Sequence, residues 1–178
     1  MNLREALRGY ANQYAEDVHA AACLLFLDEA ERPFDREHVP GHFTGSAWLV
    51  SADGEKVLLT HHRKLNRWLQ LGGHADGDSD LAAVALREAH EESGLTRLRV
   101  EPDIFDVDRH WIPERKNEPG HWHHDVRYVV WAMADEAFVV SDESLELAWV
   151  PIRTLAEASD TDESLRRMAH KWLARTQP

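Results

Sequence analysis

The segment from residue 67 to residue 95 constrains this chain more than any other part of its sequence. It reads RWLQLGGHADGDSDLAAVALREAHEESGL, which predicts a short strand, a loop rich in Gly and Asp, and a helix that ends at Gly94. Glu88, Glu91 and Glu92 stand at positions i, i+3 and i+4. This spacing places three carboxylates on one face of the helix, about 5 to 6 Å from each other at Cβ. The segment therefore concentrates negative charge at one rigid site.

These carboxylates repel one another in the last two turns of the helix, where the helix dipole is also negative. Leu81, Val84 and Ala85 supply an apolar face that can anchor the helix in a core. A divalent cation would relieve the repulsion, whereas a solvated Glu-rich helix surface is the common alternative. The preceding loop favours the cation, because Gly72 and Gly73 permit a tight bend whose backbone can approach a metal or a phosphate.

Residues 73–95 resemble the Nudix box: a glycine, a spaced glutamate, and then R-E-U-x-E-E-x-G-U with U aliphatic. The positions that match are Gly73, Arg87, Glu88, Glu91, Glu92, Gly94 and Leu95. Ser79 replaces the first glutamate, and the small Ala89 stands at an aliphatic position. Because Ser79 lies between Asp78 and Asp80, we expect it to cap the helix, and we interpret it as a variation and not a loss of the box.

The resemblance implies a fold and an activity. The fold is α/β (α+β), a Nudix-like αβα sandwich with a mixed β-sheet and extra N-terminal helices. The activity is a magnesium-dependent pyrophosphohydrolase, which cleaves a diphosphate bond in a nucleoside diphosphate-linked or nucleotide-like small molecule by water attack on phosphorus. A catalytically silent Nudix-like ligand-binding or regulatory module is the alternative, which metal-dependent turnover would exclude.

The resemblance also implies the roles of the box residues. The metal, Mg²⁺ or alternatively Mn²⁺, would be held by the carbonyl of Gly72 and the carboxylates of Glu88, Glu91 and Glu92. Arg87 would orient a glutamate by a charge-assisted hydrogen bond. The general base stays open between Glu91 or Glu92 on the helix and Glu143 in a later loop.

The histidines outside the helix predict substrate contacts. His121 and His123 fall in a predicted loop at 113–124 and would alternate toward one side if that segment were extended. A closed structural zinc site is not supported, because no cysteine neighbours them and no helical H-x-x-x-H pair is present. Solvated loop histidines are the alternative to substrate contacts. The residues we expect at the substrate are His61, Lys64, His74 and His123.

The rest of the chain predicts further helices and strands in one domain spanning 1–178. Residues 1–40 form a helical extension packed on that domain, in which apolar residues at helical spacing predict two helices. A last helix begins near Asp160. The predicted strands are 45–51, 55–62, 99–112, 125–134 and 145–151.

Composition limits the partners. A formal net charge of -12 and a pI near 5.4 disfavour polymeric nucleic acid. No segment is long and apolar enough for a membrane span, and the N-terminus lacks a signal-peptide pattern. The only cysteine, Cys23, lies in an apolar run, which indicates a buried thiol and a cytoplasmic protein. A homodimer is left open, as is the choice among a nucleoside diphosphate conjugate, an oxidised nucleoside triphosphate and a capped RNA end.

Overall fold

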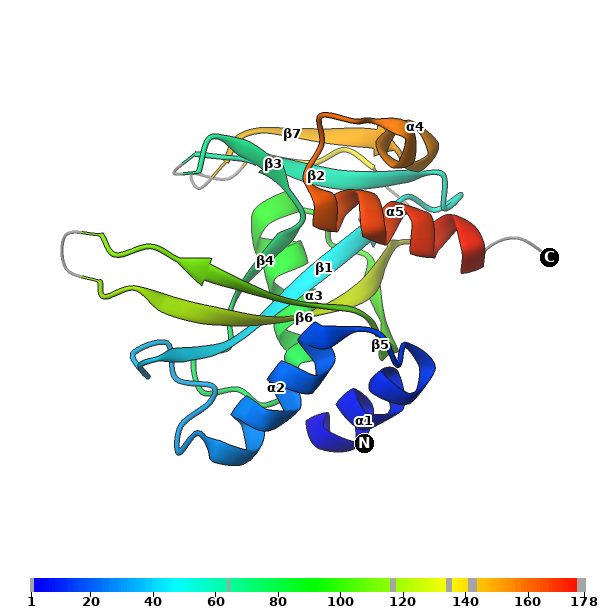
Figure 1. Cartoon of the computed structure of the whole chain (residues 1–178). Helices are drawn as coiled ribbons and strands as arrows, with labels where there is room; N and C mark the ends of the chain where they lie inside the picture. The colour runs from blue at the N-terminus through cyan, green and yellow to red at the C-terminus, as the bar shows by residue number, and fades with distance from the viewer. Residues whose placement is uncertain (1, 64, 116–117, 134–135, 141–143, 176–178) are drawn as a thin grey trace. The chain divides into compact units, whose positions relative to one another are not determined.

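A computed structural model of the chain describes all of its residues except 1, 64, 116–117, 134–135, 141–143 and 176–178 (Figure 1). Its elements in chain order are α1 (Leu3–Gln13), α2 (Val18–Glu29), β1 (Gly41–Val50), β2 (Lys56–His62), β3 (Arg67–Leu69), β4 (Leu71–His74), α3 (Leu81–Ser93), β5 (Leu98–Ile112), β6 (His121–Ala132), β7 (Ser144–Pro151), α4 (Ile152–Glu157) and α5 (Glu163–Arg175). The predicted fold class, an α/β fold with a mixed sheet and flanking helices, is confirmed.

The strands are hydrogen-bonded in the order β3-β2-β1-β6-β5, with β4 paired to β1 and β7 paired to β2. The chain divides into two compact units. The first unit comprises 1–46, 72–85 and 101–128, and the second comprises 47–71, 86–100 and 129–178. Strands β1, β4, β5 and β6 and helix α3 contribute residues to both units.

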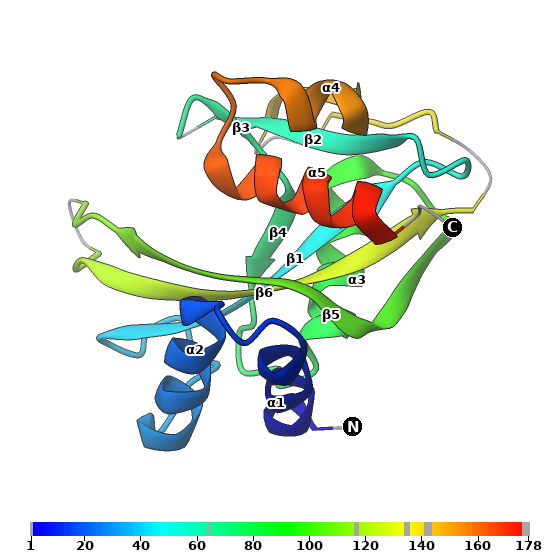
Figure 2. The same cartoon turned by 45° about the vertical axis from the view of Figure 1, so that its right-hand side comes forward.

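In the first unit, the two predicted N-terminal helices are confirmed. Asn2 caps α1 in a capping box, because its side chain accepts from the backbone N–H of Glu5 and the Glu5 carboxylate accepts from the backbone N–H of Asn2. Leu7 and Tyr10 are the buried residues of α1. Cys23 on α2 is fully buried, as predicted. Figure 2 shows α1 and α2 packed beside each other.

The first unit also corrects two strand boundaries, because β1 begins at Gly41 and β6 at His121. The predicted loop at 113–124 is therefore wrong at its end, where polar histidines were assigned to a loop although they pair in the sheet. The Trp122 backbone N–H donates to the carbonyl of Pro40 at 2.8 Å. A Cβ on Gly41 would come within 2.5 Å of the Trp122 carbonyl oxygen, so this close approach of two backbones needs glycine.

In the second unit, β2 pairs antiparallel with both β3 and β7. Helix α5 is amphipathic as predicted, and its buried residues are Leu165, Met168, Ala169 and Trp172. The indole N–H of Trp172 donates to the carbonyl of Gly54 at 2.9 Å. The predicted start at Asp160 is wrong, since the carboxylate of Asp162 accepts from the backbone N–H of Ser164 at 2.9 Å and the helix begins at Glu163. The short helix α4 was not predicted.

None of the helices among the described residues has both the length and the apolar character needed to cross a lipid bilayer.

Candidate functional site

The loop that enters the box helix is held by close backbone contacts in the first unit. A Cβ on Gly72 would come 2.8 Å from the Cα of Ser46, so only glycine allows β4 to lie this close to β1. After β4, the chain turns through Asp76 and Gly77, whose φ angles of 49° and 88° lie in the left-handed region. The backbone N–H of Gly77 donates to the carbonyl of Phe34 at 3.0 Å. The predicted bend at Gly72 and Gly73 is therefore wrong in position, because both glycines lie in β4 and the turn follows at Asp76 and Gly77.

The cap of α3 differs from the prediction. Asp80, and not Ser79, caps the helix, because its carboxylate accepts from the backbone N–H of Ala83 at 3.0 Å. The carboxylate of Asp78 in turn accepts from the backbone N–H of Asp80 at 2.9 Å. The helix begins at Leu81, one residue later than a Ser79 cap would place it. Ser79 is exposed, and its side chain is not needed to start the helix.

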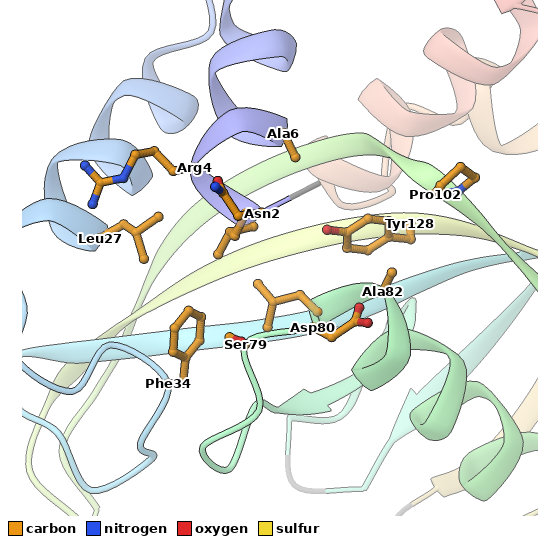
Figure 3. Close-up of a pocket in the computed structure, with 12 residues that line it drawn as sticks. Asn2, Arg4, Ala6, Leu27, Phe34, Ser79, Asp80, Ala82, Pro102 and Tyr128 are labelled. Carbon is orange, nitrogen blue, oxygen red and sulfur yellow. The ribbon is translucent and has the colours of Figure 1, made fainter.

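Ser79 and Asp80 line a cavity of about 410 Å³ in the first unit (Figure 3). The N-terminal helices contribute Asn2, Arg4 and Leu27 to the same cavity. The surroundings of Ser79 are therefore shaped by a segment that lies outside the box. Ser79, which stands where the Nudix box has a glutamate, therefore has neighbours from the N-terminal helices.

Helix α3 buries one face and holds its glutamates at the edge of that face. Its fully or almost fully buried apolar residues are Leu81, Val84, Ala85 and Ala89. Glu92 is only 8% exposed, and the side chain of Glu88 is 17% exposed, whereas Glu91 is exposed. A solvated glutamate face would expose all three, so the surface interpretation does not fit two of them.

Arg87 and Glu88 form an ion pair, with the guanidinium Nη2 donating to the carboxylate at 3.0 Å. This is the contact that the predicted positioning role of Arg87 requires, and the role itself stays a prediction. The helix ends where predicted, because Gly94 has a φ of 71° and a Cβ there would lie 3.1 Å from the Cβ of Val139.

The other predicted site residues are distributed between the units. Gly72 belongs to the first unit and the three box glutamates to the second, so the predicted metal site stays a prediction. His61 is half-buried and stacks on Trp68 with ring centroids 5.2 Å apart. Lys64 and the base candidate Glu143 lie outside the described residues.

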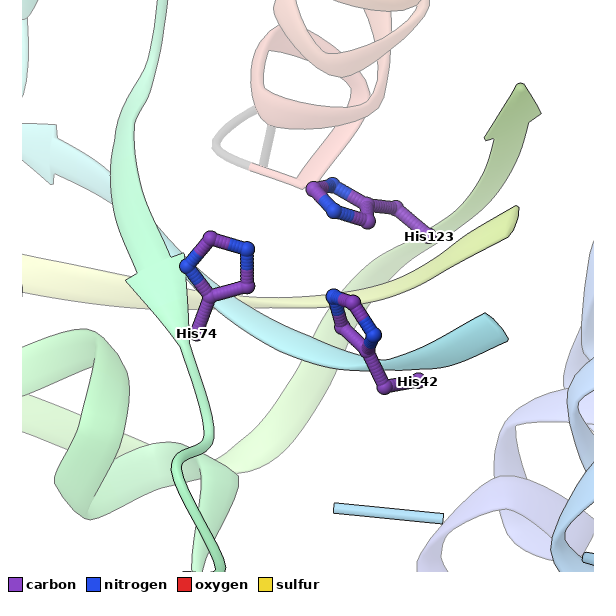
Figure 4. Close-up of side chains that lie close together, drawn as sticks. All are labelled: His42, His74 and His123. Atoms are coloured by element: carbon purple, nitrogen blue, oxygen red, sulfur yellow. The ribbon is translucent and has the colours of Figure 1, made fainter. Parts of the chain in front are cut away.

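Two of the predicted substrate residues, His74 and His123, come together with a third histidine that we did not predict, His42 (Figure 4). His42 lies on β1, His74 on β4 and His123 on β6, and β1 is the hydrogen-bonded neighbour of both other strands. The ring centroids of the three pairs are 5.1, 4.9 and 5.2 Å apart. One ring nitrogen from each histidine lies within 4.8 Å of the others. We call these three residues the histidine cluster.

Burial keeps the histidine cluster uncharged near neutral pH. It is the main cause that lowers the pKa of His42 to about 4 and that of His123 to about 2. Neighbouring histidines lower both pKa values further, chiefly His74 for His42 and His110 for His123. The pKa of His74 is also lowered, first by burial and then by Arg36. Neutral imidazoles retain a lone pair on one ring nitrogen.

A sequence signal for His42 existed in the glycines. Gly41-His42 and Gly73-His74 place a histidine directly after glycine, as does Gly120-His121 two residues before His123. A Cβ would be too close to another part of the chain at Gly41, at Gly72 beside Gly73, and at Gly120. We missed His42 because the strand was predicted to begin at residue 45.

The first unit also buries Arg127, which the sequence pattern does not distinguish from other strand residues. The guanidinium of Arg127 donates to the carboxylates of Asp125 at 2.7 Å, Asp108 at 2.9 Å and Asp106 at 3.2 Å. Burial lowers the pKa of Arg127, but these three carboxylates outweigh that effect and raise it overall. Asp125 also accepts from the Thr44 hydroxyl at 2.8 Å. The network therefore ties residues of β1, β5 and β6 together.

The profile of the NUDIX domain matches residues 42–172, which span most of the chain and include the box, α3 and the histidine cluster. This chain belongs to the NUDIX family. The family resemblance of the box is thereby confirmed, and the chain is a Nudix hydrolase that acts on phosphorus-containing anhydrides.

Relatives of this Nudix protein include nucleoside diphosphate-linked moiety X motif 6 of Xenopus laevis, 24% identical over 173 residues that cover 92% of this chain and 74% of that protein. Among solved structures, the MutT protein of Methanosarcina mazei Go1 is similar with a TM-score of 0.62 and 19% identity, covering 78% of this chain and 97% of that one. An Ap4A hydrolase of C. elegans, in a binary complex, has a TM-score of 0.57 and 16% identity, covering 75% of this chain and 96% of that one. At these identities, the structures support the fold alone.

Proposed function

We propose that this Nudix protein is a magnesium-dependent pyrophosphohydrolase that cleaves a diphosphate bond in a small nucleotide-like molecule. The observation that carries the proposal is the glutamate face of α3, on which Glu88 is ion-paired to Arg87 and Glu92 is almost completely buried. Burying carboxylates beside one another is costly unless a cation compensates them. A single buried thiol, Cys23, supports a cytoplasmic location.

The residues of α3 fit a magnesium ion. They offer carboxylate oxygens, which are the ligands that Mg²⁺ prefers, and three of them stand on one helical face. We propose Glu88, Glu91 and Glu92 as ligands together with the carbonyl of Gly72, with Mn²⁺ as an alternative ion. Magnesium bound there would neutralise charge that develops on the diphosphate oxygens.

The chain's own groups would position the reactants. Arg87 holds the Glu88 carboxylate in one orientation through their ion pair. Glu91 or Glu92 would take a proton from the water that attacks phosphorus, and the leaving phosphate would depart on the opposite side. His61, Lys64, His74 and His123 are the proposed substrate contacts.

We propose a nucleoside diphosphate linked to a second group as the substrate class. The name of the Xenopus relative supports this class, because it refers to a nucleoside diphosphate linked to a second moiety. The test is a panel of nucleotide sugars, dinucleoside polyphosphates, nucleoside triphosphates and capped RNA, each assayed with Mg²⁺ and with chelator. Magnesium-dependent release of two phosphate-bearing products supports the proposal. A folded protein that hydrolyses none of the panel favours a catalytically silent ligand-binding module instead.

Magnesium should stabilise the protein, and the size of the gain should depend on the glutamate face. A ligand that binds only the native state raises its melting temperature by mass action. Glu91→Gln removes one of three like charges, so the metal-free variant should be equally or more stable, by up to about 1 kcal/mol. Its magnesium-induced gain should nevertheless be smaller than that of the wild type. Thermal melts in chelator and in millimolar Mg²⁺ measure both effects.

Glu157→Gln is the matched control for this experiment, because Glu157 is an exposed glutamate on α4. Its magnesium-induced gain should equal that of the wild type. If Mg²⁺ shifts the wild type and Glu91→Gln equally, or shifts neither, the glutamate face is not the metal site.

A further inference from the structure

We propose that His42, His74 and His123 bind one divalent transition-metal ion of the zinc class, in addition to the magnesium proposed at α3. The histidine cluster lies entirely within the first unit, on the neighbouring strands β4, β1 and β6. Figure 4 shows the three imidazoles directed toward one another. Because each strand is fixed by its pairing, the three side chains meet without help from a loop.

The spacing of the ring nitrogens suits a common ion. They lie within 4.8 Å of one another, whereas nitrogens bound tetrahedrally to Zn²⁺ at about 2.0 to 2.1 Å are about 3.4 Å apart. Side-chain movements of about 1 Å would close the difference, which is within the reach of rotations about χ1 and χ2. The backbone need not move.

His42 supplies an independent observation. It is 1% exposed, and both of its ring nitrogens are buried with no hydrogen-bond partner among the described residues. A buried imidazole that makes no hydrogen bond is costly, and such groups are rare in folded proteins. A metal ion at the centre of the cluster would give one of these nitrogens a partner. His42 is thus the member of the cluster for which a metal ion would satisfy an otherwise buried ring nitrogen.

The neighbouring His121 determines which ring nitrogen of His123 carries the proton. The Nδ1 of His121 lies 2.8 Å from the carbonyl oxygen of Pro119, which can only accept, so that nitrogen carries the proton. In a neutral His121, Nε2 is then the acceptor, and the Nε2 of His123, 3.1 Å away, donates to it. Nδ1 of His123 is left with its lone pair. Histidines that bind metals commonly donate their other ring N–H in this way.

The donor set selects the class of ion. Three imidazoles suit zinc and similar transition metals, whereas Mg²⁺ prefers oxygen ligands. Three protein ligands also leave a fourth position on a tetrahedral ion for water or another small ligand. Uncharged imidazoles cannot attract a phosphate by charge. A metal ion bound to His74 and His123 would supply the positive charge that allows these residues to contact a phosphate-bearing substrate.

The test is a metal titration that does not depend on hydrolysis. Chelator-stripped protein carrying Glu88→Gln and Glu92→Gln, which weaken the carboxylate site, is titrated with Zn²⁺ by calorimetry and with Co²⁺ by visible absorption, both in millimolar Mg²⁺. We expect about one ion per chain and the intense visible bands of tetrahedral Co²⁺. His74→Gln and His123→Gln, both at half-buried positions, should each weaken Zn²⁺ binding by at least about 100-fold.

His170→Gln is the matched control, because His170 is an exposed histidine on α5, and it should bind Zn²⁺ like its parent. Circular dichroism establishes that each variant is folded. The proposal is overturned if the parent shows no tetrahedral Co²⁺ spectrum, a result that needs no histidine variant. It is also overturned if both folded histidine variants bind Zn²⁺ with unchanged affinity. Because hydrolysis is not measured, failure here leaves the proposed pyrophosphohydrolase untouched.

Discussion

Glu88→Gln and Glu92→Gln should each lower the turnover number, measured at the Mg²⁺ concentration that just saturates the wild type, by at least about 100-fold while leaving the protein folded. Each change keeps the size of the side chain and removes only the charge that a metal ligand or a base requires. The Arg87–Glu88 ion pair lost in the first variant is partly exposed, with 39% of the Arg87 side chain accessible, so its contribution to stability is small. Steady-state kinetics and thermal melts together separate loss of activity from loss of fold.

Glu157→Gln again serves as the control, and its turnover number should match that of the wild type. The dependence of the turnover number on Mg²⁺ concentration distinguishes a carboxylate that binds the metal from one that acts as the base. A lost ligand should be compensated in part by higher concentrations of Mg²⁺, whereas a lost base should not. Near-normal turnover in both folded variants would remove α3 from the catalytic site.

The box could be predicted from the sequence because its information is local. Helical periodicity places Glu88, Glu91 and Glu92 on one face and Leu81 on another, and neither placement depends on distant residues. The end of the helix at Gly94 is local as well. The cap was misplaced by one residue because Asp78, Ser79 and Asp80 are all good caps, and only the three-dimensional turn selects among them.

The histidine cluster could not be predicted in the same way. His42 and His74 are separated by a hairpin, and His123 follows a second long connection, so their meeting depends on strand order. Histidine has no strong preference for strand or loop, and the segments that contain His74 and His123 were assigned to loops. The hydrogen bond from Trp122 to Pro40 joins β6 to the start of β1, beside His123 and His42, and of the three histidines His42 is fully buried.

The ion pairs of Arg127 with Asp106, Asp108 and Asp125 also could not be predicted from the periodicity of the sequence. In DVRYVVWAMA, Arg127 stands among apolar residues of a predicted strand, where a charged side chain would ordinarily face solvent. Its side chain is instead 2% exposed and contacts three carboxylates. Those carboxylates come from Asp106 and Asp108 on β5 and Asp125 on β6, so the compensation is visible only in the assembled sheet.

Arg127→Met should therefore lower the free energy of unfolding by about 3 to 5 kcal/mol. Methionine fills a similar volume, but it leaves three carboxylates crowded together, of which Asp106 and Asp125 are almost completely buried. Removing one partner of a buried ion pair is far more costly than replacing the whole pair, because the remaining charge is uncompensated. Urea denaturation followed by tryptophan fluorescence measures the loss, and the chain's seven tryptophans give a strong signal.

Two further variants decide whether charge compensation is the cause. Arg99→Met replaces an exposed arginine on β5 and should change the free energy of unfolding by no more than about 0.5 kcal/mol. Adding Asp125→Asn to Arg127→Met removes one of the uncompensated charges, so the double variant should be more stable than the sum of the two single changes predicts. Strict additivity, or a loss below about 1 kcal/mol in Arg127→Met, would mean that packing and not charge holds these strands together.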